Sequence, residues 1–208
     1  ATLDISGYSV SLSADGTTVA IGAPNNDINR HYSDDAGHVR IYHYDGATWT
    51  QLGGDIDGDV LHGNGISGYS VSLSADGTTV AIGAPNNDGP REVTSGKCEV
   101  AVVEDKCEQA AVALGWIFTR RPREHSSYRP PGCNLVGSNL KYNFNTNSLG
   151  SCSSNSKCAC LEADDAGHVR IYHYEGATWK QLGGDIYGEA AGDQSGSSVS
   201  LSANGTTV

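Results

Sequence analysis

The sequence lacks methionine, has only two phenylalanines and contains no long apolar run. Its longest nearly apolar stretch, Ala110–Phe118, is less than half of the ~20 residues that a membrane-spanning helix needs, so no membrane span is expected. No charged segment followed by an apolar one stands at the start, so no secretory signal is recognised. Because the first residue is Ala1 and not Met, the chain is either a processed product or a stretch of a longer protein, and the repeats described below favour the second.

Basic residues and catalytic motifs are also scarce. There are 13 Lys and Arg against 24 Asp and Glu, and the resulting net charge of -11 argues against binding to nucleic-acid phosphates. The sequence has no Gly-x-Ser-x-Gly, no Gly-rich phosphate loop ending in Lys and no His-Glu-x-x-His. It therefore predicts no enzyme and no catalytic residue.

The chain does contain a tandem repeat. Residues 7–27, GYSVSLSADGTTVAIGAPNND, return unchanged as residues 68–88. A second block, residues 34–56, returns almost unchanged as residues 164–186. The first block begins a third time at residues 196–208. Fixed internal repetition of this kind predicts an architecture of stacked units.

Each block predicts a β-hairpin. The first block alternates apolar residues with serines over 8–12 and returns over 18–21 after an Ala-Asp-Gly-Thr turn. The second block offers strands over 38–44 and 48–52 around an Asp-Gly turn. A unit of four short antiparallel strands cannot bury both of its faces alone, so it must stack on neighbours, as a propeller blade or a solenoid layer does.

These residues support a family resemblance. Gly-Tyr-Ser-Val at 7–10, Ile-Gly-Ala-Pro at 21–24 and Gly-His-Val-Arg-Ile-Tyr at 37–42 resemble the FG-GAP repeat of integrin-α-type β-propellers. The resemblance implies an all-β fold of four-stranded antiparallel units of β-propeller type. Two units and part of a third do not reach the four blades that a closed propeller needs, so further units must come from outside this stretch or from neighbouring chains.

The resemblance also raises the question of calcium, because many FG-GAP repeats bind it in an Asp-x-Asp-x-Asp-Gly loop. This sequence has single carboxylates there, Asp15 and Asp76, which we interpret as turn residues because one carboxylate cannot replace several oxygen ligands. Richer in oxygen are the loops that contain Asp27, Asp34 and Asp35, and Asp88, Asp164 and Asp165. The favoured alternative is that these residues cap turns, and no other cofactor or metal is expected.

An insertion interrupts the second unit. Residues 89–163 stand where the first unit uses only residues 28–33. We therefore divide the chain into repeat 1 with the first half of repeat 2 (1–88), an inserted module (89–163), and the second half of repeat 2 with a partial repeat 3 (164–208). Within the insert, residues 104–114 predict one helix, with Asp105 as a cap and Gly115 as a stop, and the rest predicts loops.

All the cysteines fall inside this insert, without a Cys-x-x-Cys pair and with only His125 nearby. This pattern predicts three disulfides rather than a zinc site, and so an oxidising compartment, extracellular or at the cell surface. The pairing stays open, except that the two cysteines separated by one residue are expected to take different partners. The six are Cys98, Cys107, Cys133, Cys152, Cys158 and Cys160.

The insert is weakly basic, at +2, whereas the rest of the chain carries -13. Its most basic stretch contains Arg120, Arg121, Arg123 and Arg129, a candidate contact for an acidic glycan or a protein partner. The favoured alternative is a solvated loop. One glycosylation sequon is present, Asn204-Gly205-Thr206, at a predicted hairpin turn.

Taken together, these features predict an extracellular structural or adhesive glycoprotein, a subunit or fragment of a surface filament or matrix. The half-unit at 196–208 suggests self-association through strand edges into a head-to-tail assembly. The alternative is a propeller-type binding module that recognises a glycan or a cell-surface protein through its loops and insert. A third hypothesis is an appendage of a secreted hydrolase.

Overall fold

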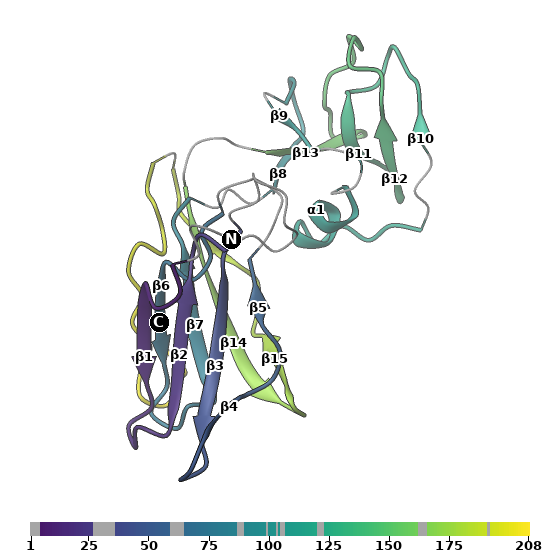
Figure 1. Ribbon diagram of the computed structural model, residues 1–208. Helices are drawn as coiled ribbons and strands as arrows, with labels where there is room; N and C mark the ends of the chain where they lie inside the picture. Colours follow the sequence, from purple (N-terminus) through teal and green to yellow (C-terminus); the bar gives the residue numbers. More distant parts are fainter. Residues whose placement is uncertain are drawn as a thin grey trace. The chain divides into compact units, whose positions relative to one another are not determined.

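A computed structural model describes residues 5–26, 36–58, 65–86, 90–98, 100–102, 104, 107–119, 123–161, 166–190 and 192–208. The chain divides into two compact units. Unit 1 consists of Ala1–Asn87 together with Asp164–Val208, and unit 2 is Asp88–Ala163. Strands are the main regular secondary structure of both units, as the sequence predicts for the repeats but not for the insert (Figure 1).

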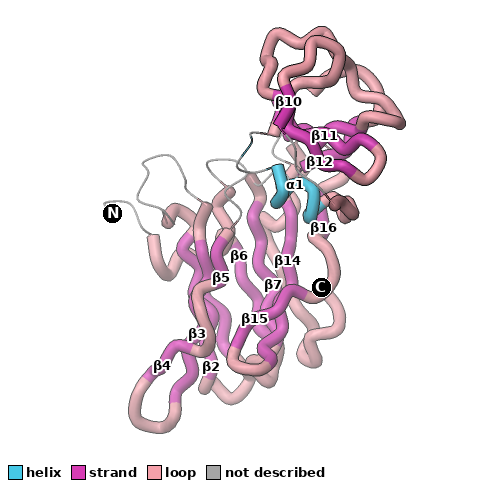
Figure 2. The backbone as a smooth tube through the Cα atoms, turned by 90° about the vertical axis from the view of Figure 1, so that its right-hand side faces the viewer, coloured by secondary structure: helices cyan, strands magenta, loops and turns pink. Residues whose placement is uncertain are grey.

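Unit 1 holds two antiparallel sheets built on the same plan. The first sheet has the order β1-β2-β3-β4, with β5 also paired to β3, and the second has the order β6-β7-β14-β15, with β16 paired to β14. Figure 2 shows that the axes of the strands in the two sheets are roughly aligned. The first sheet comprises β1 (Ser9–Leu12), β2 (Thr18–Ala23), β3 (His38–Tyr44), β4 (Trp49–Gln51) and β5 (Ile56–Asp57). The second comprises β6 (Ser70–Leu73), β7 (Thr79–Ala84), β14 (His168–Glu175), β15 (Thr178–Gln181) and β16 (Ile186–Tyr187).

The turn between β1 and β2 shows why an acidic residue is repeated there. Asp15 Oδ1 accepts hydrogen bonds from Ser13 Oγ at 2.6 Å and from both the N–H and the Oγ1 of Thr17 at 2.9 Å. These donors lower the pKa of Asp15 to about 2. Asp76 makes the same contacts before β7, so both aspartates are turn residues, as predicted.

The two sheets pack face to face around one apolar core. The fully buried side chains come from β2, β3, β5, β6 and β7, and Leu52, Tyr172 and Trp179 pack against them. Burial of such residues between the two sheets is the main stabilising contribution to unit 1, because a single sheet has no core of its own. The buried residues are Ala20, Val39, Ile41, Ile56, Val71, Leu73, Val80 and Ile82.

The insertion leaves the strand register of the repeat unchanged. β2 pairs with β3 from Ala23↔His38 onward, and β7 pairs with β14 from Ala84↔His168 onward. These are equivalent positions of the two units, although the second connection contains unit 2. The connection therefore starts and ends at neighbouring strand ends.

Unit 2 is a six-stranded sheet with one helix. Its order is β10-β12-β11-β13-β8, with β9 paired to β13, and all pairs are antiparallel except β10 with β12. The strands are β8 (Pro90–Val93), β9 (Val100–Ala101), β10 (Arg123–Glu124), β11 (Gly132–Val136), β12 (Asn139–Asn143) and β13 (Lys157–Leu161).

The predicted helix is confirmed as α1 (Cys107–Ala113), and Gly115 follows it with a φ of 66°. The predicted cap Asp105 lies outside the described residues. The prediction that the rest of the insert is loop is wrong, because β11 and β12 form a hairpin around Gly137, which has a φ of 61°. A Gly-Ser pair between two short apolar stretches was the available signal for it.

Three disulfides hold unit 2, as predicted. Cys98 is bonded to Cys160, Cys107 to Cys133, and Cys152 to Cys158, so the last two cysteines of the sequence do take different partners. Three bridges indicate an oxidising compartment. No helix among the described residues has the length and hydropathy to span a membrane.

Each of the two sheets contains an equivalent Arg–Asp ion pair, and comparison of the two pairs tests how stability depends on pH. Arg170 and Asp185 are largely buried, with Nη2 and Oδ2 2.6 Å apart, whereas the equivalent Arg40 and Asp55 are more exposed. Burial alone would raise the pKa of Asp185, but the hydrogen bonds and charge of Arg170 outweigh it and hold this pKa at about 2. A lowered pKa stabilises the fold above the unfolded value near 4, and this contribution is lost as the pH falls toward 2.

We therefore expect Asp185→Asn to lower the free energy of unfolding by about 3 kcal/mol at pH 7. The difference from the unmodified protein should shrink as the pH falls from 4 to about 2. Asp55→Asn is the control, with an expected loss below about 1 kcal/mol. Urea unfolding across this pH range measures both, and equal losses for the two variants would contradict the assignment.

Candidate functional site

Successive sheets of unit 1 are joined by serine hydroxyls. At the first junction, Ser9 Oγ donates a hydrogen bond to the carbonyl oxygen of Gly68 at 2.8 Å. The backbone N–H of Leu73 donates to Ser11 Oγ at 2.9 Å. The serines that alternate with apolar residues in β1 are therefore contacts to the next sheet, and not simply solvated side chains.

The same contacts recur between the second sheet and the third copy, defined as residues 196–208. Ser70 Oγ donates to the carbonyl oxygen of Gly196 at 2.7 Å, and the N–H of Leu201 donates to Ser72 Oγ at 2.9 Å. The third copy, the yellow end of the chain, lies beside β6 (Figure 1). The contact between the first and second sheets and the contact between the second sheet and the third copy therefore use equivalent atoms.

Glycine is required where the backbones of neighbouring sheets meet. A Cβ atom at Gly22 would overlap the carbonyl oxygen of Gly68, and one at Gly83 would overlap that of Gly196. Both glycines belong to the Ile-Gly-Ala-Pro segment of the repeat. The close approach of the next sheet therefore requires glycine at this position of the segment.

A tryptophan closes the far side of the junction. Trp179 Nε1 donates to the carbonyl oxygen of Leu52 at 2.7 Å and its ring lies 5.2 Å from that of Tyr174. Its counterpart Trp49 has the same ring contact, 5.3 Å from Tyr44, but is half exposed. Trp49 is therefore the equivalent N–H donor of the first sheet.

Apolar side chains that are buried at the internal junction are exposed at the ends of unit 1. Val10 and Leu12 of β1 are 63% and 59% exposed, whereas their counterparts in β6, Val71 and Leu73, are 9% and 7% exposed. We call Tyr8, Val10, Leu12 and Trp49 the outer face of the first sheet.

The opposite end shows the complementary surface. Leu182 and Ile186 are both about half exposed, whereas their counterparts Leu52 and Ile56 pack in the core. We call Leu182 and Ile186 the outer face of the second sheet. The two outer faces therefore correspond to the two surfaces that meet at the junction between the first and second sheets.

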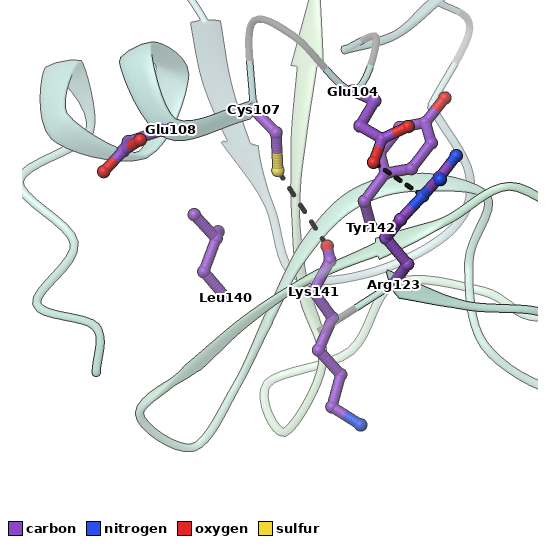
Figure 3. A pocket seen from close by; sticks show the side chains of 7 residues that line it. All are labelled: Glu104, Cys107, Glu108, Arg123, Leu140, Lys141 and Tyr142. Atoms are coloured by element: carbon purple, nitrogen blue, oxygen red, sulfur yellow. Dashed lines mark hydrogen bonds and ion pairs between the residues drawn. The ribbon is translucent and has the colours of Figure 1, made fainter. Parts of the chain in front are cut away.

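Unit 2 contains a cavity of about 380 Å³ between α1, β10 and β12 (Figure 3). Arg123 and Glu104 point toward one another in it, with Nε and Oε1 2.7 Å apart, and Tyr142 lines the same cavity. Its charged side chains are two glutamates, one arginine and one lysine, so its formal charge is balanced. The lining residues are Glu104, Cys107, Glu108, Arg123, Leu140, Lys141 and Tyr142.

Two of the predicted ligand-binding arginines are paired with glutamates. Arg123 contacts Glu104 and also lies over the ring of Phe144, 5.6 Å from its centre. Arg129 Nε lies 3.4 Å from Glu124 Oε1. Arg120 and Arg121 lie outside the described residues. The described pair is therefore charge-compensated, which weakens an acidic-glycan contact there.

Asn143 holds the loop that carries Arg129, a role that the sequence analysis missed. Its buried amide donates to the carbonyl oxygens of Ser126, Arg129 and Pro130 at 2.9 to 3.1 Å, while its Oδ1 accepts from the N–H of Ser126 at 3.0 Å. One Asn among several in this segment gives no sequence signal for such a role.

The other predicted sites are placed as follows. The calcium positions Asp27, Asp34, Asp35, Asp88, Asp164 and Asp165 all lie outside the described residues. Asn204 is exposed, and its Oδ1 accepts hydrogen bonds from Ser202 Oγ and from the N–H and Oγ1 of Thr206, as Asp15 does in the first copy. Among the described residues these bonds go to the oxygen, not to the nitrogen that a glycan would modify. Glycosylation stays a prediction.

The histidines repeat within the sheets. Those at the start of β3 and β14, His38 and His168, are buried, and the Nδ1 atoms of His43 and His173 lie 3.2 and 3.1 Å from threonine hydroxyls. The clustered sulfur atoms of Cys98, Cys152 and Cys160 belong to disulfides and are not free metal ligands.

Comparison with known proteins gives no family assignment. No protein-family model matches the chain, and no curated protein sequence is significantly similar to it. The resemblance to FG-GAP repeats therefore stays a prediction.

The glycine contact at the junction yields a direct test. Gly22→Ala would place a methyl group against the Gly68 carbonyl, and we expect a loss of at least about 2 kcal/mol in unfolding free energy. Gly54→Ala is the control, because nothing lies within 4 Å of its Cβ position. Thermal and urea unfolding of both variants measure the difference, and an unchanged Gly22→Ala protein would refute the tight junction.

Proposed function

We propose that this chain is an extracellular structural repeat protein that assembles end to end through its outer sheet faces. The observation that carries the proposal is the duplicated junction, whose apolar halves are exposed again at the two ends of unit 1. A repeated head-to-tail contact that does not close produces a filament, and one that closes produces a ring. The assembly uses sheet faces, in place of the strand edges that the sequence suggested.

The extracellular location is supported by unit 2. Its three disulfides suit an oxidising compartment, and the exposed sequon at Asn204 suits a secreted glycoprotein. The antiparallel sheets of unit 1, stacked by repetition, support units of the β-propeller type that the FG-GAP resemblance implies. Adhesion to other surfaces would then depend on the loops and the insert that the assembly exposes.

The test is self-association of the intact chain, measured by sedimentation velocity and electron microscopy. We expect concentration-dependent oligomers or fibres. The double variant Val10→Ser, Leu12→Ser should weaken association at least tenfold, because burial of each side chain contributes about 1.5–3 kcal/mol.

Ile117→Ser is the matched control, since Ile117 of unit 2 is also strongly exposed but is not part of either outer face. Its association should equal that of the unmodified protein. A chain that stays monomeric at micromolar concentration, without fibres, would remove the structural assembly as its function.

A second candidate function is a binding module, and the cavity of unit 2 favours it. Arg123, Glu104 and Tyr142 supply hydrogen-bonding groups and a ring edge in one cavity with balanced formal charge. Such a lining suits a neutral sugar better than a strongly acidic one, because an acidic ligand would meet two glutamates.

The binding function predicts glycan recognition by the intact chain on a glycan array. Tyr142→Ala should abolish the signal, and Lys97→Ala, an exposed change elsewhere in unit 2, should keep it. Circular dichroism would verify that both variants are folded. A signal that survives Tyr142→Ala would remove the cavity as the binding site, and no signal at all would leave no support for this candidate.

A further inference from the structure

We propose that Tyr8 and Tyr69 form an oxidative modification site, at which a carbon–carbon bond joins the two phenol rings. Tyr8 directly precedes β1 and Tyr69 directly precedes β6, so the bond would connect the first sheet of unit 1 covalently to the second. The co-reactant is hydrogen peroxide acting through a haem peroxidase. This inference goes beyond the assembly proposed above and does not require it, because both tyrosines belong to one chain.

The two tyrosines occupy the same position in successive copies of the repeat, and their rings are in contact. The ring centres lie 4.9 Å apart and the ring planes are inclined by 45°. This separation is at the short end of the range for aromatic pairs in proteins. A side-chain hydrogen bond between the two phenols raises the pKa of Tyr8, so the hydroxyl groups also lie next to each other.

The backbone of the junction holds the two rings in this arrangement. The N–H of each tyrosine donates to the carbonyl oxygen of the isoleucine three residues before it, at 3.3 Å for Tyr8 and 3.2 Å for Tyr69. Ser9, the residue after Tyr8, donates through Oγ to the carbonyl oxygen of Gly68, the residue before Tyr69, at 2.8 Å. The contact between the rings is therefore set by the junction and not by the rings alone.

The coupling step balances with one molecule of hydrogen peroxide. Each phenol gives up one electron and its hydroxyl proton, which leaves two tyrosyl radicals. A Cε carbon of one ring then bonds to a Cε carbon of the other, and each of these carbons loses its hydrogen as a proton while each oxygen regains one. In total two electrons and two protons leave, and they convert the peroxide to two molecules of water. The product is two hydrogen atoms lighter than the unmodified chain.

Contact selects this pair because radical coupling requires two phenols to meet. Groups that are held together react as if at a very high local concentration, whereas two separate molecules must first collide. Tyr128 is 92% exposed and meets an oxidant easily, but no ring of a described residue packs against it. Tyr44 and Tyr174 contact tryptophan rings instead.

The bond would restrain unit 1 in a way that its side chains otherwise do not. All the cysteines lie in unit 2, so unit 1 has no disulfide. A cross-link between residues that are distant in the sequence reduces the conformational freedom of the unfolded chain, as a disulfide does. The first and second sheets would then stay together even when the apolar core between them opens.

The experiment treats the intact chain at low concentration with a haem peroxidase and one equivalent of hydrogen peroxide. Dityrosine fluorescence measures the yield, and mass spectrometry identifies the linked tryptic peptides. We expect peptide 1–30, whose one tyrosine is Tyr8, to be joined to peptide 41–91, which contains Tyr69. The product should stay monomeric on a denaturing gel, and its yield per chain should not depend on protein concentration. It should also unfold at a higher urea concentration than the untreated chain.

Tyr8→Phe and Tyr69→Phe should each reduce the yield at least tenfold, because phenylalanine keeps the ring but cannot form the phenoxyl radical. Tyr128→Phe is the matched control and should leave the yield unchanged. Circular dichroism verifies folding, and free tyrosine in the same reaction verifies the oxidant.

Links between other tyrosines, a yield that rises with protein concentration, a yield that Tyr69→Phe leaves unchanged, or the absence of dityrosine would each overturn the site. None of these outcomes decides whether the chain self-associates, so the two proposals fail separately.

Discussion

The fold of unit 1 depends on the close approach of one sheet's backbone to the next at Gly22 and Gly83. Without side chains there, the carbonyl of Gly68 or Gly196 can reach the serine hydroxyl of the preceding sheet. The spacing set by this contact also brings the apolar side chains of both faces together. The serines and the glycine that recur in the first block therefore have a physical reason to recur, because they contact the following sheet as well as their own.

The two units reach stability by different means. Unit 1 has sheets with one buried face each, and the apolar residues between them provide the core. Unit 2 has a buried cluster built on disulfide cysteines, and it combines three covalent bridges with a buried Asn143 that satisfies several carbonyl groups at once. Stacking is therefore a requirement for the first unit and not for the second.

The sequence predicts unit 1 well because repetition makes every local signal appear twice: the alternation in β1, the Asp15 turn and the hairpin after His38 are all as expected. Unit 2 is predicted only through its cysteines and α1, since the Asn-rich β11 and β12 give weak alternation. The candidate site was harder still. The roles of Ser9 and Trp179 depend on contacts between sheets, and a pattern along one strand carries no information about which neighbour a hydroxyl or an indole will meet.

The pairing of Ala84 with His168 has a consequence for how such proteins diversify. A segment whose two ends leave from adjacent, hydrogen-bonded strands closes almost no additional loop, and loop-closure entropy grows only slowly with the length between them. Another domain can therefore replace unit 2 at this connection while the strand register of unit 1 stays the same. The connection between β7 and β14 is therefore a position at which the repeat accepts an inserted domain, and the equivalent connection between β2 and β3 starts and ends at strand ends paired in the same way.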